Sequence, residues 1–225
     1  DVMEELSGGR ISHAVNVIGG VRIDLDAAHT RSIQQRFDEL ERQVEKALAL
    51  INNEPSLKAR TQGVGLLSAE QVARYCVVGP VARASGVDVD LRRDFPRPPY
   101  DQLKFNVITH PAGDVWARTL VRVQEIRESL SLCRQILAQL PDGPTSVAMK
   151  RRVPPGEVVS RSEAPRGEVI YYIRSDGSDK PARLKIRTPT LTALITLADQ
   201  LRGVNVADVP VVLSGVDLCI ACADR

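Results

Sequence analysis

The sequence lacks a long apolar run, an export signal and an excess of charge of one sign. No stretch reaches the roughly 18 uninterrupted apolar residues that a membrane-spanning helix needs. The net charge of +2 at pH 7 argues against a general nucleic-acid binder. With four cysteines in 225 residues and no signal-peptide pattern, a reducing compartment is favoured over a secreted disulfide scaffold.

The overall composition is that of a globular protein. Hydrophobic residues make up 43% and charged residues 26% of the chain, which excludes disordered and collagen-like classes. A chain of 225 residues forms one large domain or two small ones and needs no disulfides for stability. It begins at Asp1 rather than Met, so we expect a processed protein or a piece of a longer one.

Hydrophobic periodicity predicts two long helices. The first carries a face of Ile33, Phe37, Leu40, Val44, Leu48 and Ile51, and it ends at 52–55. The second follows Gly113-Asp114, and its stripe is Trp116, Leu120, Val123, Ile126, Leu130, Cys133 and Leu137. Between the two helices, Ser68 is predicted to cap a short helix, and residues 92–99 are predicted to form a loop.

The pattern changes after residue 150. Residues 168–174 and 182–187 predict a β-hairpin around the turn cluster 175–179, and Thr188-Pro189 opens a helix that ends near Gly203. The predicted fold is therefore α+β and mainly helical, with long antiparallel helices in 1–150. The part from 151 to 225 contributes the small hairpin, the helix and a tail.

Two kinds of cysteine are present. Cys76 and Cys133 stand alone in apolar company and are interpreted as inert core residues. Cys219 and Cys222 form a C-x-x-C pair, and two thiolates at this spacing can point at one metal ion; such soft ligands suit zinc, copper(I), nickel or an iron–sulfur centre.

The pair supplies only half of a four-thiolate set. The three histidines, none with paired spacing, are His13, His29 and His110. A thioredoxin-like redox pair and a chance pair in a tail remain alternatives at this point.

Arg166 is the second candidate site residue. It stands between Pro165 and Gly167, which predicts a constrained, extended backbone. Its guanidinium cannot lose its proton and presents a planar fork of donors, which suits the anionic ligands of a buried centre. A solvent-facing arginine at the start of a strand is the alternative.

The order of these motifs resembles a known family. Glu163-Ala-Pro-Arg-Gly167, a hairpin and then Asp217-x-Cys-x-x-Cys-x-x-Arg225 are similar to the large subunit of energy-converting nickel–iron (NiFe) hydrogenases. They are also similar to that protein's relative in respiratory complex I, the 49-kilodalton-type (D-type) subunit. Further matching segments, in the same order, are 19–22, 79–80, 83–86, 90–93, 99–100, 113–114, 175–177 and 207–209.

The resemblance implies site residues and an activity. Cys219 and Cys222 would bind nickel, and Cys222 would also bridge to iron. Asp217 matches the acidic residue before the pair, and Arg166 matches the arginine over the iron's diatomic ligands, where a fixed cation can orient and polarise hydrogen. The intact protein would oxidise hydrogen or reduce protons and exchange electrons with an iron–sulfur small subunit. It would be cytoplasmic and peripheral to the membrane through its complex.

Two alternatives within the superfamily stay open. The complex I subunit has lost these cysteines and serves quinone reduction in an NADH:quinone oxidoreductase, so the retained pair favours the hydrogenase branch. The other alternative is a non-catalytic structural subunit.

The chain also departs from the family pattern. Leu218 replaces a proline, and the N-terminal region with the first Arg-x-Cys-x-x-Cys motif and a proton-relaying glutamate is missing. Arg225 falls where the maturation protease of the family cuts.

We therefore read residues 1–225 as a C-terminal portion that binds no nickel–iron centre by itself. We also expect Arg166 to lie near the two thiols. A further expectation is an apolar patch around Ile220 and the first 25 residues, with self-association through it.

Overall fold

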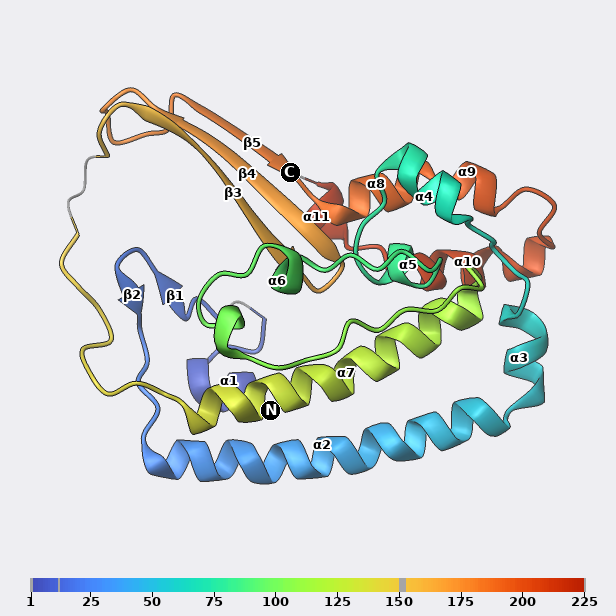
Figure 1. Cartoon of the computed structure of the whole chain (residues 1–225), viewed down its shortest axis with the longest axis horizontal. Coiled ribbons are helices and arrows are strands. Elements are labelled where there is room, and N and C mark those ends of the chain that lie inside the picture. The colour runs from blue at the N-terminus through green and yellow to red at the C-terminus, as the bar shows by residue number, and fades with distance from the viewer. Residues whose placement is uncertain (1, 12, 150–152, 225) are drawn as a thin grey trace.

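The computed structural model describes residues 2–11, 13–149 and 153–224, so Arg225 lies outside the described residues. Two long helices, α2 (Ala27–Asn53) and α7 (Val115–Ala138), run antiparallel along one side of the molecule (Figure 1). Short helices cover the end where α7 begins. From them a small sheet projects toward the other end of α7, at the upper left of Figure 1. The predicted α+β, mainly helical class agrees with this arrangement.

An aspartate caps the start of each long helix, and α7 begins where the sequence predicted. The carboxylate of Asp26 accepts hydrogen bonds from the backbone N–H groups of Ala28 and His29. The carboxylate of Asp114 accepts one from the N–H of Ala117. Each cap satisfies donors that the first turn of a helix leaves unpaired, so the chain enters both helices at defined residues.

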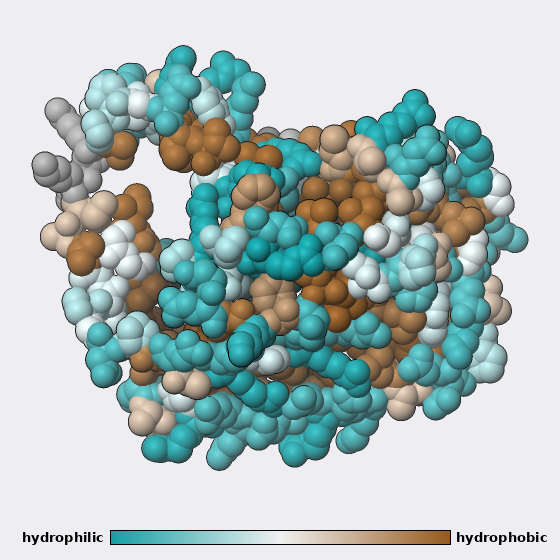
Figure 2. All heavy atoms as spheres, in the orientation of Figure 1, coloured by the Kyte–Doolittle hydropathy of each residue, from teal (hydrophilic) through white to brown (hydrophobic). Residues whose placement is uncertain are grey.

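The buried faces are only partly those that periodicity predicted. In α2, Ile33, Val44 and Leu48 are buried, but Leu40 is 41% exposed. Every residue in the first turn of α7 is buried, because this turn passes through the middle of the short helices, whereas Ile126 farther along is 39% exposed. Figure 2 shows the outer surface of α2 as mostly hydrophilic.

Ion pairs link the exposed flanks of the two long helices. Arg134 of α7 pairs with Asp38 at 2.9 Å and with Glu41 at 2.8 Å, and Arg127 pairs with Glu45. Pairs of this exposure contribute little free energy, and their order along the two helices matches the antiparallel arrangement.

Short helices fill the segment between α2 and α7, as expected. Ser68 caps α4 and forms a capping box with Gln71. The expectation that 92–99 is a loop was partly wrong, because the Asp90 carboxylate caps the N–H of Arg92 and starts the helix α6. The short elements here are α3 (Pro55–Thr61), α4 (Ala69–Tyr75), α5 (Pro80–Arg83), α6 (Leu91–Asp94) and the 3-10 turn η1 (Tyr100–Gln102).

The projecting sheet has three antiparallel strands, not the two that were predicted. β4 (Gly167–Ser175) and β5 (Arg183–Arg187) form the predicted hairpin, and β3 (Gly156–Ala164) adds a strand to the other edge of β4. The sequence prediction missed β3 because only part of it alternates. A second sheet is the ribbon of β1 (Asn16–Val17) and β2 (Gly20–Val21), preceded by the helix α1 (Val2–Ser7).

One face of the projecting sheet is apolar. Val158, Ile173 and Leu184 lie directly opposite one another across the strands and are 57%, 37% and 48% exposed. Figure 2 shows apolar surface where this sheet overhangs an open notch. The described residues therefore leave this face partly in solvent.

The C-terminal segment is more helical than expected. The apolar run 209–213 lies in the helix α10, which continues to Val216. Thr188-Pro189 opens a helix as predicted, but that helix breaks into two at Thr196. The elements of this segment are α8 (Pro189–Ile195), α9 (Leu197–Gln200), η2 (Val206–Asp208), α10 (Val209–Val216) and α11 (Ile220–Ala223).

The two lone cysteines were placed wrongly in the core. Cys76 and Cys133 are both exposed. Cys76 ends α4 in a left-handed conformation with φ of 52°, and the next residue, Val77, is buried in its place. In α7 the neighbouring positions Leu130 and Leu132 are buried instead of Cys133.

The helices of the described ranges include none that is both long and apolar enough to cross a membrane.

Two backbones meet where the β3–β4 hairpin reaches the start of α5. A Cβ atom on Gly79 would lie 2.3 Å from the carbonyl oxygen of Arg166, and one on Gly167 would lie 2.7 Å from the Gly79 nitrogen. Gly167 also has a φ of +119°, which side-chain-bearing residues rarely adopt. The hairpin can dock here only because both positions are glycine.

We predict that Gly167→Ala destabilises the chain strongly. Backbone strain and the clash with Gly79 together should cost about 3 kcal/mol of unfolding free energy. Urea denaturation measures the loss. Gly63→Ala is the matched control, because Gly63 has a φ of +70° with nothing within 4 Å of an added Cβ. Equal losses in the two variants would show that the contact with Gly79 contributes nothing.

Self-association stays a prediction. Ile220 is 77% exposed, as expected, and Ile11 and Ile18 in the N-terminal segment are 92% and 88% exposed. Sedimentation velocity over a range of concentrations should show dimers or larger species that Ile220→Ser weakens. A strictly monomeric chain at all concentrations would contradict the expectation.

Candidate functional site

The candidate site forms where the tip of the β3–β4 hairpin meets the C-terminal tail. Ala164 pairs with Gly167, so Pro165 and Arg166 are the two residues of a tight hairpin turn. The extended backbone expected for Arg166 was therefore wrong. The turn aims the side chain away from the sheet and toward the end of α10.

Arg166 contacts Asp217 through two hydrogen bonds. Its Nε donates to the Asp217 carbonyl oxygen at 2.7 Å, and its Nη2 donates to Asp217 Oδ1 at 3.1 Å. These residues are 51 positions apart in the chain. The guanidinium is 32% exposed and the carboxylate 41%, so the pair lies at the edge of solvent. The structure thus brings two of the predicted site residues into direct contact and excludes a solvent-facing Arg166 without a partner.

Asp217 holds the chain in a sharp turn between α10 and the cysteines. Its φ of 57° and ψ of 60° are left-handed, a conformation that aspartate tolerates better than most side chains. Its N–H donates to the Ser214 carbonyl and so caps α10. This turn sends Cys219 and Cys222 back toward the hairpin.

Cys219 caps the N-terminus of the one-turn helix α11, and Cys222 lies within that helix. The N–H of Cys222 donates to the Cys219 carbonyl at 3.0 Å, and the Thr188 hydroxyl donates to the Cys222 carbonyl at 2.8 Å. Both cysteines are free and partly exposed. The second bond ties the tail to the first residues of α8.

The two thiols differ in acidity. A hydrogen bond from Cys222, together with the charge of Arg166, lowers the pKa of Cys219. Burial and the neighbouring Cys219 raise the pKa of Cys222, although Arg166 acts in the other direction. The first proton therefore leaves Cys219, and the charge of Arg166 reaches both sulfurs.

A buried ion cluster holds the hairpin against the helices. Arg83 is 2% exposed and pairs with Glu125 at 2.7 Å, with Glu163 at 3.0 Å and with Asp90 at 3.5 Å. Burial is the main cause that raises the pKa of Glu163. Glu163 belongs to the same Glu-Ala-Pro-Arg-Gly segment as Arg166, so this cluster fixes the hairpin tip.

Sequence reasoning missed the role of this cluster. The signal that could have found it was a charged residue inside a run of small apolar ones, Val81-Ala82-Arg83-Ala84. A charge in such a run is buried with the run and needs carboxylate partners.

The described residues contain no group of three or more His, Cys, Asp and Glu side chains that could hold a metal ion. The histidines make local contacts elsewhere: His13 with Ser7 and Gly9, His29 with Asp26, and His110 with the N–H of Ala112. The thiol pair therefore has no third ligand of these types in this part of the chain.

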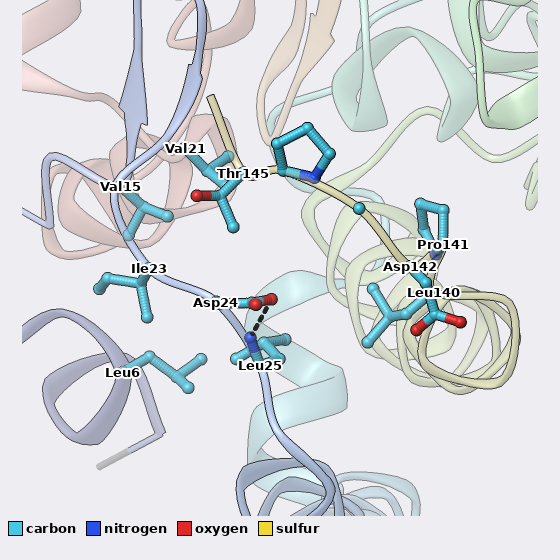
Figure 3. A pocket seen from close by; sticks show the side chains of 12 residues that line it. Leu6, Val15, Val21, Ile23, Asp24, Leu25, Leu140, Pro141, Asp142 and Thr145 are labelled. Atoms are coloured by element: carbon cyan, nitrogen blue, oxygen red, sulfur yellow. Dashed lines mark hydrogen bonds between the residues drawn. The ribbon is translucent and has the colours of Figure 1, made fainter. Parts of the chain in front are cut away.

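A cavity lies away from Arg166 and the two thiols. It measures about 570 Å³ and is bordered by α1, the β1–β2 ribbon and the segment after α7 (Figure 3). Most of its lining is aliphatic, and the carboxylate of Asp24 accepts a hydrogen bond from the Leu25 N–H. This cavity has neither a thiol nor an arginine in its walls, so the candidate site is at the hairpin tip.

Comparison with known proteins identifies the relatives of this chain. The family model described as respiratory-chain NADH dehydrogenase, 49 Kd subunit, matches residues 1–153 and 145–225. The carbon monoxide-induced hydrogenase of Rhodospirillum rubrum is 40% identical over 226 residues, which cover 100% of this chain and 63% of that protein.

Other relatives carry a different name. The second D-type subunit of the NADH-quinone oxidoreductase of Sinorhizobium medicae is 37% identical over 253 residues, covering 100% of this chain and 63% of the relative. The D-type subunit of the corresponding Dehalococcoides mccartyi enzyme is 36% identical over 227 residues, again over the whole chain and 62% of the relative. The chain thus spans less than two thirds of the length of these relatives. It belongs to the family of the 49 Kd subunit of respiratory-chain NADH dehydrogenase.

Proposed function

We propose that this chain is the C-terminal part of the catalytic large subunit of an energy-converting nickel–iron hydrogenase. The observation that carries the proposal is the pair of free thiols, Cys219 and Cys222, beside an arginine whose charge reaches both. The 40% identity to a carbon monoxide-induced hydrogenase supports the same branch. The reaction is the oxidation of hydrogen or the reduction of protons.

The donor set fits half of a nickel–iron site. Thiolates are soft ligands suited to nickel and iron, and the lowered pKa of Cys219 favours the thiolate form that binds a metal. The other half of the thiolates would come from the remaining length of the whole protein. The centre, when bound, supplies the activation of hydrogen.

Arg166 and Asp217 place a positive charge beside the thiols. Arg166 cannot act as an acid or base at physiological pH, so its role is to present a fixed positive charge beside the thiols. Asp217 accepts two of its hydrogen bonds and thereby holds the guanidinium in one orientation. We assign Arg166 and Asp217 to the site as the residues that set the field around the metal-binding thiols.

The whole protein would work in a complex. We place it in the cytoplasm, peripheral to the membrane, with an iron–sulfur small subunit as electron partner and membrane subunits below. The large-subunit fold of nickel–iron hydrogenases is part of this proposal.

A second candidate is a quinone-reducing complex I subunit of the D type. The names of relatives at 36% to 37% identity favour it. That function needs no thiol pair, so nickel content separates it from the hydrogenase. A structural subunit without activity would show neither nickel nor quinone reduction.

We predict that nickel in the whole protein depends on the thiol pair. Cys219→Ser and Cys222→Ser should each reduce nickel from near one per protein to background, because each removes a ligand, and should abolish hydrogen-dependent dye reduction. Elemental analysis of the purified complex measures the metal. Cys133→Ser is the control, because this exposed thiol lies on α7 and should leave nickel unchanged. Nickel that survives in the Cys219 variant would overturn the assignment.

We also predict that the 225-residue chain alone holds no stoichiometric nickel and iron. The reason is the donor count, since two thiols cannot enclose a centre that needs more. Metal analysis of the chain, purified without its partners, checks this. One nickel with one iron per chain would refute it.

Arg166→Gln should shift the titration of both thiols to higher pH. Loss of the guanidinium removes a charge that lowers both pKa values, so less thiolate is present at pH 7 and alkylation slows. The rate of iodoacetamide labelling against pH, read separately for each cysteine by mass spectrometry, measures the shift. Arg166→Lys keeps the charge and should stay closer to the parent. An unchanged profile in Arg166→Gln would show that the charge does not reach the sulfurs.

A further inference from the structure

A second cavity lies behind the hairpin tip, between α5, α6, α7 and the end of β3. It measures about 420 Å³. Its polar lining includes Arg92, Arg122, Glu163, Tyr100 and Ser129, and its apolar lining includes Pro165. Pro165 precedes Arg166, so one wall of this cavity is the back of the candidate site.

The carboxylates around this cavity are already occupied. Glu163 accepts hydrogen bonds from Arg83 and from the N–H of Leu91, and Glu125 accepts one from Arg83. Asp90, behind them, accepts three hydrogen bonds from Arg92, two of them from its side chain. The arginines Arg83 and Arg92 are therefore neutralised by the protein itself.

Arg122 lines the same cavity but, unlike Arg83 and Arg92, pairs with no carboxylate among the described residues. Within residues 2–11, 13–149 and 153–224, its guanidinium has no hydrogen bond and no ion pair. Burial lowers its pKa, while the charges of Asp217 and Glu125 act in the opposite direction from a distance. An arginine keeps its proton even when burial lowers its pKa, so Arg122 presents to the cavity a charged guanidinium whose N–H donors have no hydrogen-bond partner among the described residues.

The preceding turn of α7 offers Arg122 no hydrogen-bond partner. Arg118, one turn earlier, is fully buried and donates to Gln200 and to the carbonyls of Gly65 and Gly113. Its pKa falls to about 10, because of burial first and the like charge of Arg122 second. Two arginines on one face of α7 thus lack a hydrogen-bonded carboxylate partner among the described residues.

We propose that Arg122 anchors a small organic monoanion, of the carboxylate class, in this cavity. A carboxylate matches the planar fork of a guanidinium with two parallel hydrogen bonds. Glu125 and Glu163 stand in the walls of the cavity, so a dianion such as phosphate would be repelled more than a monoanion. The hydroxyls of Tyr100 and Ser129 line the same space and can donate to the ligand's oxygens. The proposal does not rest on the proposed hydrogenase function.

The test is an amide NMR titration of the 225-residue chain with sodium acetate and, separately, sodium phosphate at constant ionic strength. We expect saturable acetate shifts at cavity residues with a dissociation constant on the order of 1 mM, and weaker binding of phosphate. Arg122→Gln should weaken acetate binding at least tenfold. Arg127→Gln, on the same helix but paired with Glu45 on the surface, is the matched control and should bind as the parent does.

Arg122→Lys is a second variant, which keeps the test decisive if Arg122→Gln does not fold. It keeps the charge but loses the planar fork, so acetate should bind several-fold more weakly while the amide spectrum stays folded. No saturable acetate binding in the parent, equal binding by the Gln or Lys variant, or tighter binding of phosphate than acetate would each overturn the proposal.

Discussion

One buried arginine determines where the functional end of this molecule lies. Arg83 is almost fully out of water, and an unpaired charge in that position would cost several kcal/mol. Its three carboxylate partners come from α7, from the start of α6 and from β3. Satisfying this single charge therefore fixes three separate segments around α5. The exposed ion pairs between α2 and α7 are equal in number, but solvent screens them, so they contribute much less to the arrangement of the segments.

The candidate site follows from that cluster in two steps. Glu163 is held by Arg83, and only two residues separate it from Arg166, so the hairpin tip has little freedom. The contact between the backbones of Gly79 and Gly167 then sets the depth to which the hairpin docks. With the tip fixed, the side chain of Arg166 reaches the left-handed turn at Asp217, which in turn directs the thiols. The buried salt bridge between Arg83 and Glu163 thus indirectly positions the partly exposed pair of cysteines.

The sequence predicted those features that local chemistry controls. Both long helices, the Ser68 cap and the β4–β5 hairpin depend on periodicity and turn residues, and all three are present. The features that failed depend on partners distant in the chain. Nothing local marks β3 as the edge partner of β4, and Cys133 has apolar neighbours in the sequence although its own position on α7 is exposed. That Arg166 lies near the C-terminal tail was expected only through family resemblance, and its contact with Asp217, 51 positions away, was not predicted.

The site combines a firmly held platform with a weakly held tail. The platform consists of Glu163, Arg166 and the helices around Arg83. The tail contributes partly exposed thiols, the exposed Ile220 and a carbonyl bond from Thr188. A metal held by both thiols, as proposed, would stabilise the tail by binding only its ordered form, since ligands stabilise the state they bind. Under this proposal, the partly exposed thiols would be accessible to an incoming metal, and the platform would already hold the charge of Arg166 beside them.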